Sequence, residues 1–290
     1  MAEKLALGML RGLLRLPFRW RVAVAGWVGD TIVARFSRMP ERVQTAVQHF
    51  LPELPASEAK RIGAEVPGNF ARMIIEILSA DELAKIAATL TLEGPGLAAL
   101  DEAHAQGRAV ILASAHLGNY DVWRLALIAR GFKVGGYFNQ LGSPGFNDMY
   151  LRAVSTPGAH MFPNTSDGRK SMIRFLRSGG MLGIGVDLDR TSGVLLDFLG
   201  QPTRTVLSMA EMALKYDAAL VPIYGIRTKE QPGFRIWIDA AVPHGDPMVM
   251  TQALNDSLGA QVRAHPEQWV YWHNRRKQDH PDSDTADDTP

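Results

Sequence analysis

An apolar run that ends beside a histidine constrains this chain more than any other feature. Residues 108–113 have the length and β-branched content of a buried strand, and residues 121–129 have the pattern of a following helix. We therefore expect His116 in a strand-to-helix turn and Asp121 in the first turn of the helix. Gly118 permits unusual backbone angles and Asn119 is a good helix N-cap, so both residues favour such a turn.

This turn can build a general base. Positions five apart do not share a face of one continuous helix, so a His116–Asp121 pair needs the histidine in the turn. Asp121 would then accept a hydrogen bond from one imidazole nitrogen while the other removes a proton from a hydroxyl. The alternative is that His116 only ends a strand and that Asp121 is an ordinary first-turn acid favoured by the helix dipole.

The rest of the chain alternates in a way that predicts the α/β class, as a single domain with a central mixed sheet flanked by helices. Strands are expected near 132–138, 181–186, 218–226 and 234–239, and helices near 145–154, 167–177, 206–216 and 248–264. Functional groups of such sheets collect at the carboxyl ends of the strands. The residues expected there are His116, Asn139, Asp187 and Arg227.

Several sequence blocks together resemble one family. The block His116-Leu117-Gly118-Asn119-Tyr120-Asp121 is similar to the H-x4-(D/E) motif of glycerolipid acyltransferase-like proteins, in the form found in lipid A biosynthesis lauroyl/myristoyl acyltransferases. Residues 185–189 and 193–205 resemble the D-x-D and G-V-x-V-x-F-F-G-x-P-x-x-T segments of that family. Residues 221–224 and 266–276 resemble its later blocks, in the same order.

The resemblance implies a fold and an activity. It implies a glycerolipid acyltransferase-like fold that moves a fatty acyl group from acyl carrier protein to a hydroxyl of a lipid A precursor, with no metal and no organic cofactor. His116 would be the base and Asp121 the group that orients it. The residues expected to bind substrate are Asn119, Asn139, Arg152, Arg204 and Arg227.

Asp187 is expected to have a structural role, holding Arg190, Arg204 or another base. Asp187 and Asp189 lack a third ligand nearby, so a metal pair is not expected. Two departures from the family pattern bear on acyl-chain or acceptor preference. Asp121 stands where many members have glutamate, and an acid and a leucine occupy 197 and 199.

The first 42 residues predict a membrane-surface region. They hold eight bases against three acids, and apolar residues recur at helical spacing until Pro17 ends or kinks the helix. The longest uncharged run here, 22–29, is far short of the roughly 20 residues that span a bilayer. We expect an amphipathic helix that lies on an anionic leaflet, and no signal peptide. The family resemblance implies that this leaflet is the cytoplasmic face of a Gram-negative inner membrane. A helix packed on its own core is the alternative.

Composition and missing motifs narrow the function classes. The chain has no cysteine, which excludes disulfides and acyl-cysteine intermediates, and it has no nucleophile elbow, phosphate loop, dinucleotide fingerprint or zinc-protease motif. No stacking motif accompanies the bases at 275–277, so nucleic acid is not an expected partner. We expect an acyltransferase domain at 43–277 and a disordered acidic tail at 278–290, where five acids stand without Lys or Arg.

Two other functions stay open at this stage. One is acylation of another membrane lipid, such as a lysophospholipid or a glycosylated phospholipid. The other is a catalytically silent lipid-binding or membrane scaffold protein.

Overall fold

A seven-stranded, mostly parallel sheet organises the chain. The structure is a computed structural model that describes residues 2–155, 160–187, 193–229, 233–270 and 272. The strand order is β1-β9-β8-β2-β5-β3-β4, and β9 runs antiparallel to β8. The strands are β1 (Leu92–Glu93), β2 (Val110–Ser114), β3 (Val134–Phe138), β4 (His160–Pro163), β5 (Met181–Gly185), β8 (Ala219–Arg227) and β9 (Phe234–Ile238). A separate hairpin pairs β6 (Val194–Phe198) with β7 (Gln201–Thr205).

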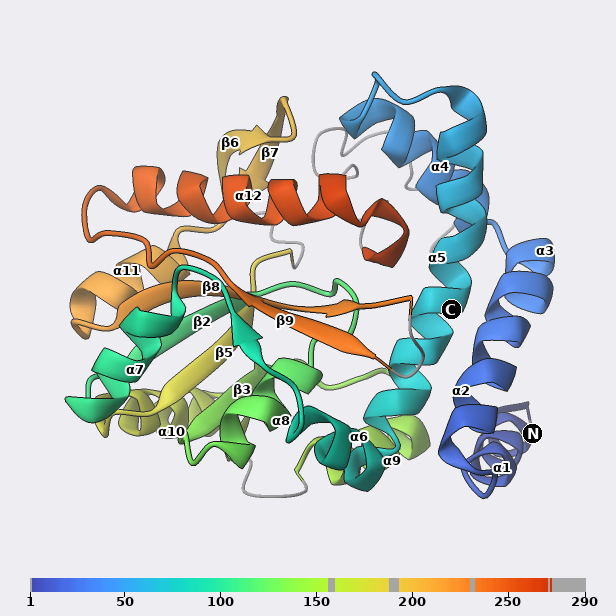
Figure 1. The fold of residues 1–290 in the computed structure, drawn as a ribbon, viewed down its shortest axis with the longest axis horizontal. Helices are drawn as coiled ribbons and strands as arrows, with labels where there is room; N and C mark the ends of the chain where they lie inside the picture. Colours follow the sequence, from blue (N-terminus) through green and yellow to red (C-terminus); the bar gives the residue numbers. More distant parts are fainter. Residues whose placement is uncertain (1, 156–159, 188–192, 230–232, 271, 273–290) are drawn as a thin grey trace.

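Helices cover both faces of this sheet (Figure 1). They are α1 (Ala2–Leu13), α2 (Phe18–Trp27), α3 (Ala34–Phe36), α4 (Met39–Phe50), α5 (Ala56–Ile77), α6 (Ala80–Ala87), α7 (Leu97–Ala105), α8 (Val122–Ala129), α9 (Pro144–Val154), α10 (Ser166–Arg177), α11 (Ser208–Lys215) and α12 (Pro247–Ala264). A π-helical segment, Val28–Val33, joins α2 to α3, and a 3-10 turn, Pro266–Gln268, follows α12.

The side chains of strand β2 show why helices cover both faces of the sheet. Val110 and Leu112 pack with residues of α6, α7 and α8 in one core cluster. Ile111 and Ala113 point to the other face and pack with residues of α4, α5, α10, α11 and α12. Because side chains alternate across a strand, a strand that is apolar throughout must be covered on both faces.

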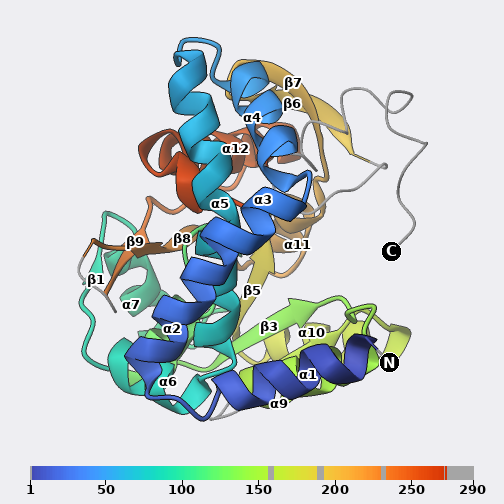
Figure 2. The same ribbon diagram turned by 90° about the vertical axis from the view of Figure 1, so that its right-hand side faces the viewer.

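The long helix α5 links the sheet to the N-terminal helices. In Figure 2, α2 and α3 lie against the outer side of α5, and α1 lies beside α9. Pro17 stands immediately before α2, so the predicted break after the first helix is confirmed. None of the described helices is both long and apolar enough to cross a membrane.

The predicted α/β class, a single domain with a central mixed sheet flanked by helices, is confirmed. The predicted strands and helices match β2, β3, β5, β8 and β9 and α8 to α12 within a few residues. Short β4 and the β6–β7 hairpin were not among the predictions. The predicted tail at 278–290 lies outside the described residues.

Candidate functional site

The turn after β2 is built as its residues predict. Gly118 has a φ of 61°, and a Cβ at this position would lie 2.2 Å from the carbonyl oxygen of Gly225. Asn119 Oδ1 accepts hydrogen bonds from the N–H groups of Asp121 (3.0 Å) and Val122 (3.1 Å), which caps the start of α8. His116 therefore lies in the turn and Asp121 at the start of the helix, as expected.

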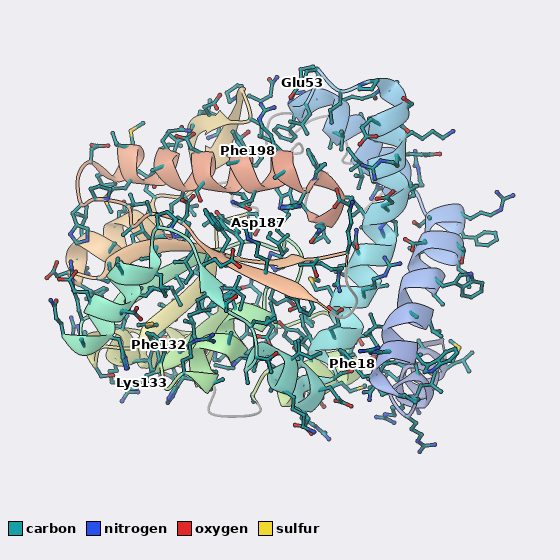
Figure 3. The ribbon with its side chains drawn as sticks, viewed as in Figure 1. Phe18, Glu53, Phe132, Lys133, Asp187 and Phe198 are labelled. Carbon is teal, nitrogen blue, oxygen red and sulfur yellow. The ribbon has the colours of Figure 1, made fainter. Side chains whose placement is uncertain are left out.

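The group that holds the imidazole is Asp187. His116 Nδ1 lies 3.0 Å from Asp187 Oδ1, and the His116 N–H donates to Oδ2 at 2.8 Å. The indole Nε1 of Trp269 also donates to Oδ2, at 2.9 Å. The Asp187 side chain is fully buried, whereas that of His116 is 23% exposed. Figure 3 shows Asp187 in the interior of the molecule.

Sheet order brings these two residues together. His116 and Asp187 each follow the end of a strand by two residues, and the last residues of those strands, Ser114 of β2 and Gly185 of β5, are paired in register. The carboxyl ends of neighbouring parallel strands share one edge of the sheet, so the two side chains meet there.

Asp121 has a different partner from the one that its spacing predicts. Its Oδ1 and Oδ2 accept hydrogen bonds from Nε (2.6 Å) and Nη2 (3.0 Å) of Arg124. Residues three apart lie on the same side of a helix, so Arg124 is within easy reach of Asp121. The prediction that Asp121 holds the imidazole ring is thus corrected, because the carboxylate bonded to His116 Nδ1 is that of Asp187. Asp187 was expected to hold Arg190, Arg204 or another base, and the described groups that it binds belong to His116 and Trp269.

Charges at the site support an ionised Asp187. Burial alone would raise the pKa of Asp187, but the His116 charge and hydrogen bonds from His116 and Trp269 lower it below its ordinary value. Burial likewise opposes the charge of Arg124, while the Asp121 carboxylate raises the pKa of this guanidinium. The site therefore contains two buried carboxylates, one facing an imidazole and one facing a guanidinium.

We expect Asp121→Asn to destabilise the fold by about 3–5 kcal/mol, because it leaves the buried Arg124 cation without its counter-charge. The double variant Asp121→Asn/Arg124→Met should recover most of that loss. Denaturant unfolding measures the free energies. If the single variant keeps wild-type stability and the double variant is less stable, the pair does not have this role.

His116 faces a large cavity of about 510 Å³. Most of its wall is apolar and comes from α5, β3, β5, α8 and α9. Its residues include Phe70, Met73, Ile74, Trp123, Phe138, Leu141, Phe146, Met161, Ile184 and Val270. The polar atoms in the wall belong to a few side chains, among them His116, Asp121, Arg124, Tyr120 and Tyr150. Such a cavity suits a hydrocarbon chain with one reactive end.

The other predicted substrate-binding residues differ in their position relative to the cavity. Asn139 lines the cavity, and its Oδ1 accepts from Asn164 Nδ2 at 2.8 Å. Arg152 is exposed on α9, and exposed Arg204 on β7 donates to the Gly193 carbonyl at 3.1 Å. Asn119 is buried in the cap of α8. Neither it, Arg152 nor Arg204 is among the described residues that line the cavity.

Arg227 belongs to a buried network. Both of its terminal nitrogens donate to the carboxylate of Glu76 on α5, and Asn119 Nδ2 donates to the same carboxylate at 3.0 Å. Glu76 is fully buried, so this network ties α5 to the turn that carries His116. Sequence reasoning missed Glu76, although a lone acid among Ile74, Ile75 and Ile77 is a signal for a buried ion pair.

No cluster of three or more His, Asp or Glu in the described part of the chain could hold a metal ion. Asp189 and Arg190, two residues weighed from the sequence, lie outside the described residues.

Comparison with known proteins gives concordant matches. A family model described as bacterial lipid A biosynthesis acyltransferase matches residues 2–278. The chain is 24% identical to "Lipid A biosynthesis acyltransferase 2" of Shigella flexneri over 282 residues, covering 91% of this chain and 86% of that protein. It is 23% identical to "Lipid A biosynthesis acyltransferase" of Haemophilus influenzae over 259 residues, covering 88% and 81%.

A second group of relatives carries a different name. "Phosphatidylinositol mannoside acyltransferase" of Mycobacterium tuberculosis is 28% identical over 178 residues, which cover 60% of this chain. The match spans just over half the length of that relative, at 56%.

Proposed function

Because the chain belongs to the bacterial lipid A biosynthesis acyltransferase family, we propose that it transfers a fatty acyl group from a thioester to a hydroxyl of a membrane lipid. One observation carries this proposal. An imidazole anchored by a buried carboxylate, His116 with Asp187, faces an apolar cavity large enough for an acyl chain.

The chemistry follows from this arrangement. With Nδ1 engaged by Asp187, His116 Nε2 takes the proton of the acceptor hydroxyl as its oxygen attacks the thioester carbonyl carbon. Asp187 stabilises the imidazolium that forms. The C–S bond then breaks, and the imidazolium gives its proton to the departing thiolate. A thioester is already activated, so the step needs no covalent enzyme intermediate. Asp121 takes no part in this proton transfer. It holds the Arg124 guanidinium, and both side chains line the cavity.

We assign acyl carrier protein as the donor and a lipid A precursor as the acceptor. The relatives named for lipid A biosynthesis match 88% and 91% of this chain, which favours that acceptor. A glycosylated phospholipid is the second candidate, supported by the mycobacterial relatives, whose name specifies phosphatidylinositol mannoside. Arg152, exposed on α9, remains our candidate for contact with an acceptor phosphate.

The N-terminal helices would place this cavity at a membrane. They expose Leu5, Met9, Trp20, Trp27 and Phe36, the last at 82% exposure. Helix α1 packs beside α9, where Ser143 at its N-cap donates to Glu3 at 2.7 Å, and Phe146 and Tyr150 of α9 line the His116 cavity. Exposed aromatic residues among arginines suit the surface of an anionic leaflet. The inner-membrane location, on its cytoplasmic face, is part of this proposal.

We expect Trp20→Ser/Trp27→Ser/Phe36→Ser to weaken binding to phosphatidylglycerol vesicles at least about tenfold, since each aromatic ring contributes apolar area to the interface. Vesicle flotation measures the bound fraction. The matched control is Leu195→Ser/Met248→Ser/Val249→Ser, which removes three exposed apolar side chains elsewhere. Equal binding of the two triple variants would contradict this membrane surface.

The decisive experiment is acyl transfer by purified protein from lauroyl- or myristoyl-carrier protein. The acceptors are a Kdo-bearing lipid A precursor and a mannosylated phosphatidylinositol. Product with the first acceptor alone supports the lipid A assignment, and product with the second alone moves the assignment to glycosylated phospholipids. The test covers several acyl-chain lengths and both carrier-protein and coenzyme A donors. If neither acceptor gives product under any of these conditions, a catalytically silent lipid-binding protein is favoured.

A further inference from the structure

A strongly basic surface surrounds α10, on the side of the molecule away from the N-terminal helices. We call it the α10 basic face and define it by six exposed side chains: Lys133, Arg169, Lys170, Arg174, Arg177 and Lys215. In Figure 1, α10 and α11 lie toward the left, whereas α2 and α3 lie at the right edge. Figure 3 places Lys133 at the surface on that left side.

Shared aromatic contacts make this a continuous surface. The Arg177 guanidinium and the Lys215 ammonium both lie over the ring of Tyr216, at 5.3 and 5.7 Å from its centre. Lys133 Nζ lies 5.2 Å from the Phe175 ring centre and donates to Ser178 Oγ at 2.9 Å. These contacts hold Lys133, just before β3, against α10, and they bring Arg177 of α10 beside Lys215 of α11.

The six bases outnumber the exposed acids beside them, which are Asp167 of α10, Glu211 of α11 and Asp217. Lys170 pairs with Asp167 at 3.2 Å, but both side chains are largely exposed, and such pairs are weak. The large apolar side chains of α10 are buried or half-buried, as Met172, Phe175 and Leu176 show. A charged helix face whose own large apolar side chains are covered suits an acidic soluble protein better than a bilayer surface.

A second cavity leads from this face toward His116. Its volume is about 660 Å³, and Arg169 and Met172 of α10 contribute to its wall. It shares Tyr137, Ile184 and Gly185 with the His116 cavity, and Val186 in its wall precedes Asp187. Its wall also carries polar side chains, including Asn164, Ser208 and Glu211, which suit an amide-containing linker.

We propose that the α10 basic face docks the acidic carrier protein that brings the acyl thioester, and that the carrier's flexible arm enters through this second cavity. The proposal rests on the proposed function, whose donor it places on the surface. It separates the two substrates in space. The carrier approaches at α10, while the lipid acceptor approaches from the α1–α3 side, where exposed Phe70 and Leu141 line the His116 cavity.

The test compares two donors with the same acyl chain, lauroyl-carrier protein and lauroyl-pantetheine. We expect Lys170→Glu/Arg174→Glu to raise KM for the carrier donor about tenfold, since reversing two charges turns attraction to an acidic partner into repulsion at two positions. Transfer from lauroyl-pantetheine should stay within about twofold of wild type. The matched control is Lys60→Glu/Lys85→Glu, which reverses two exposed helical lysines on α5 and α6.

The outcomes separate docking from function. Equal carrier KM for both double variants would overturn the docking site while wild-type turnover upholds the acyltransferase. The docking site would also be overturned if the wild-type protein used lauroyl-pantetheine but did not use lauroyl-carrier protein. Equal losses with both donors, together with weaker flotation on phosphatidylglycerol vesicles, would assign the face to the membrane instead. Absence of wild-type product with either donor would contradict the proposed function itself.

Discussion

Replacing His116 with alanine is expected to lower kcat for acyl transfer by at least about a thousandfold. A positioned general base contributes about 10²–10⁴ to the rate, and the acceptor hydroxyl ionises too weakly near neutral pH to attack without one. The variant also loses the imidazolium that returns a proton to the leaving thiolate. Initial rates with saturating donor and acceptor measure this loss.

A second histidine provides the control. His104 is exposed on α7 and packs against the ring of Phe132, and it is not among the described residues that line the His116 cavity. His104→Ala should keep wild-type turnover, and thermal unfolding of both variants should show that each is folded. A folded His116→Ala protein with wild-type kcat would exclude this histidine as the base.

The turn that carries His116 could be predicted because its determinants are local. A buried strand, a glycine with positive φ and a capping asparagine lie within a dozen residues, and each restricts the backbone on its own. The predicted positions of β2, His116 and α8 therefore agree with the structure.

The partner of His116 could not be predicted in the same way. Asp187 lies 71 residues away, and it reaches the imidazole only because β2 and β5 are neighbours in the sheet. Strand order depends on packing over the whole chain, which neighbouring residues do not reveal. The H-x4-D spacing favoured Asp121, but the same helix offers Arg124 three residues later, a competing partner that the sequence already displayed.

The two carboxylates are expected to differ in role: Asp187 supports catalysis, and Asp121 supports stability. Asp187→Asn is expected to lower kcat about 10²–10⁴-fold, because an amide can present the wrong group to Nδ1 and cannot stabilise the imidazolium as a carboxylate does. KM for the donor should change little, since Asp187 is fully buried and is not among the described residues that line either cavity. Steady-state kinetics measure both constants.

The pH dependence of the unfolding free energy tests whether the charge of Asp187 matters, and not only the volume of its side chain. The pKa of Asp187 is lowered in the folded state: burial opposes this shift, but the His116 charge and hydrogen bonds from His116 and Trp269 outweigh it. Its contribution to stability is therefore present above the unfolded-state pKa, about 3.9, and is lost as the pH falls through the lower folded-state value. Asp187→Asn should remove this part of the acid destabilisation of the wild type. An Asn variant with wild-type kcat and an unchanged dependence of unfolding free energy on pH would show that the Asp187–His116 pair does not activate the base.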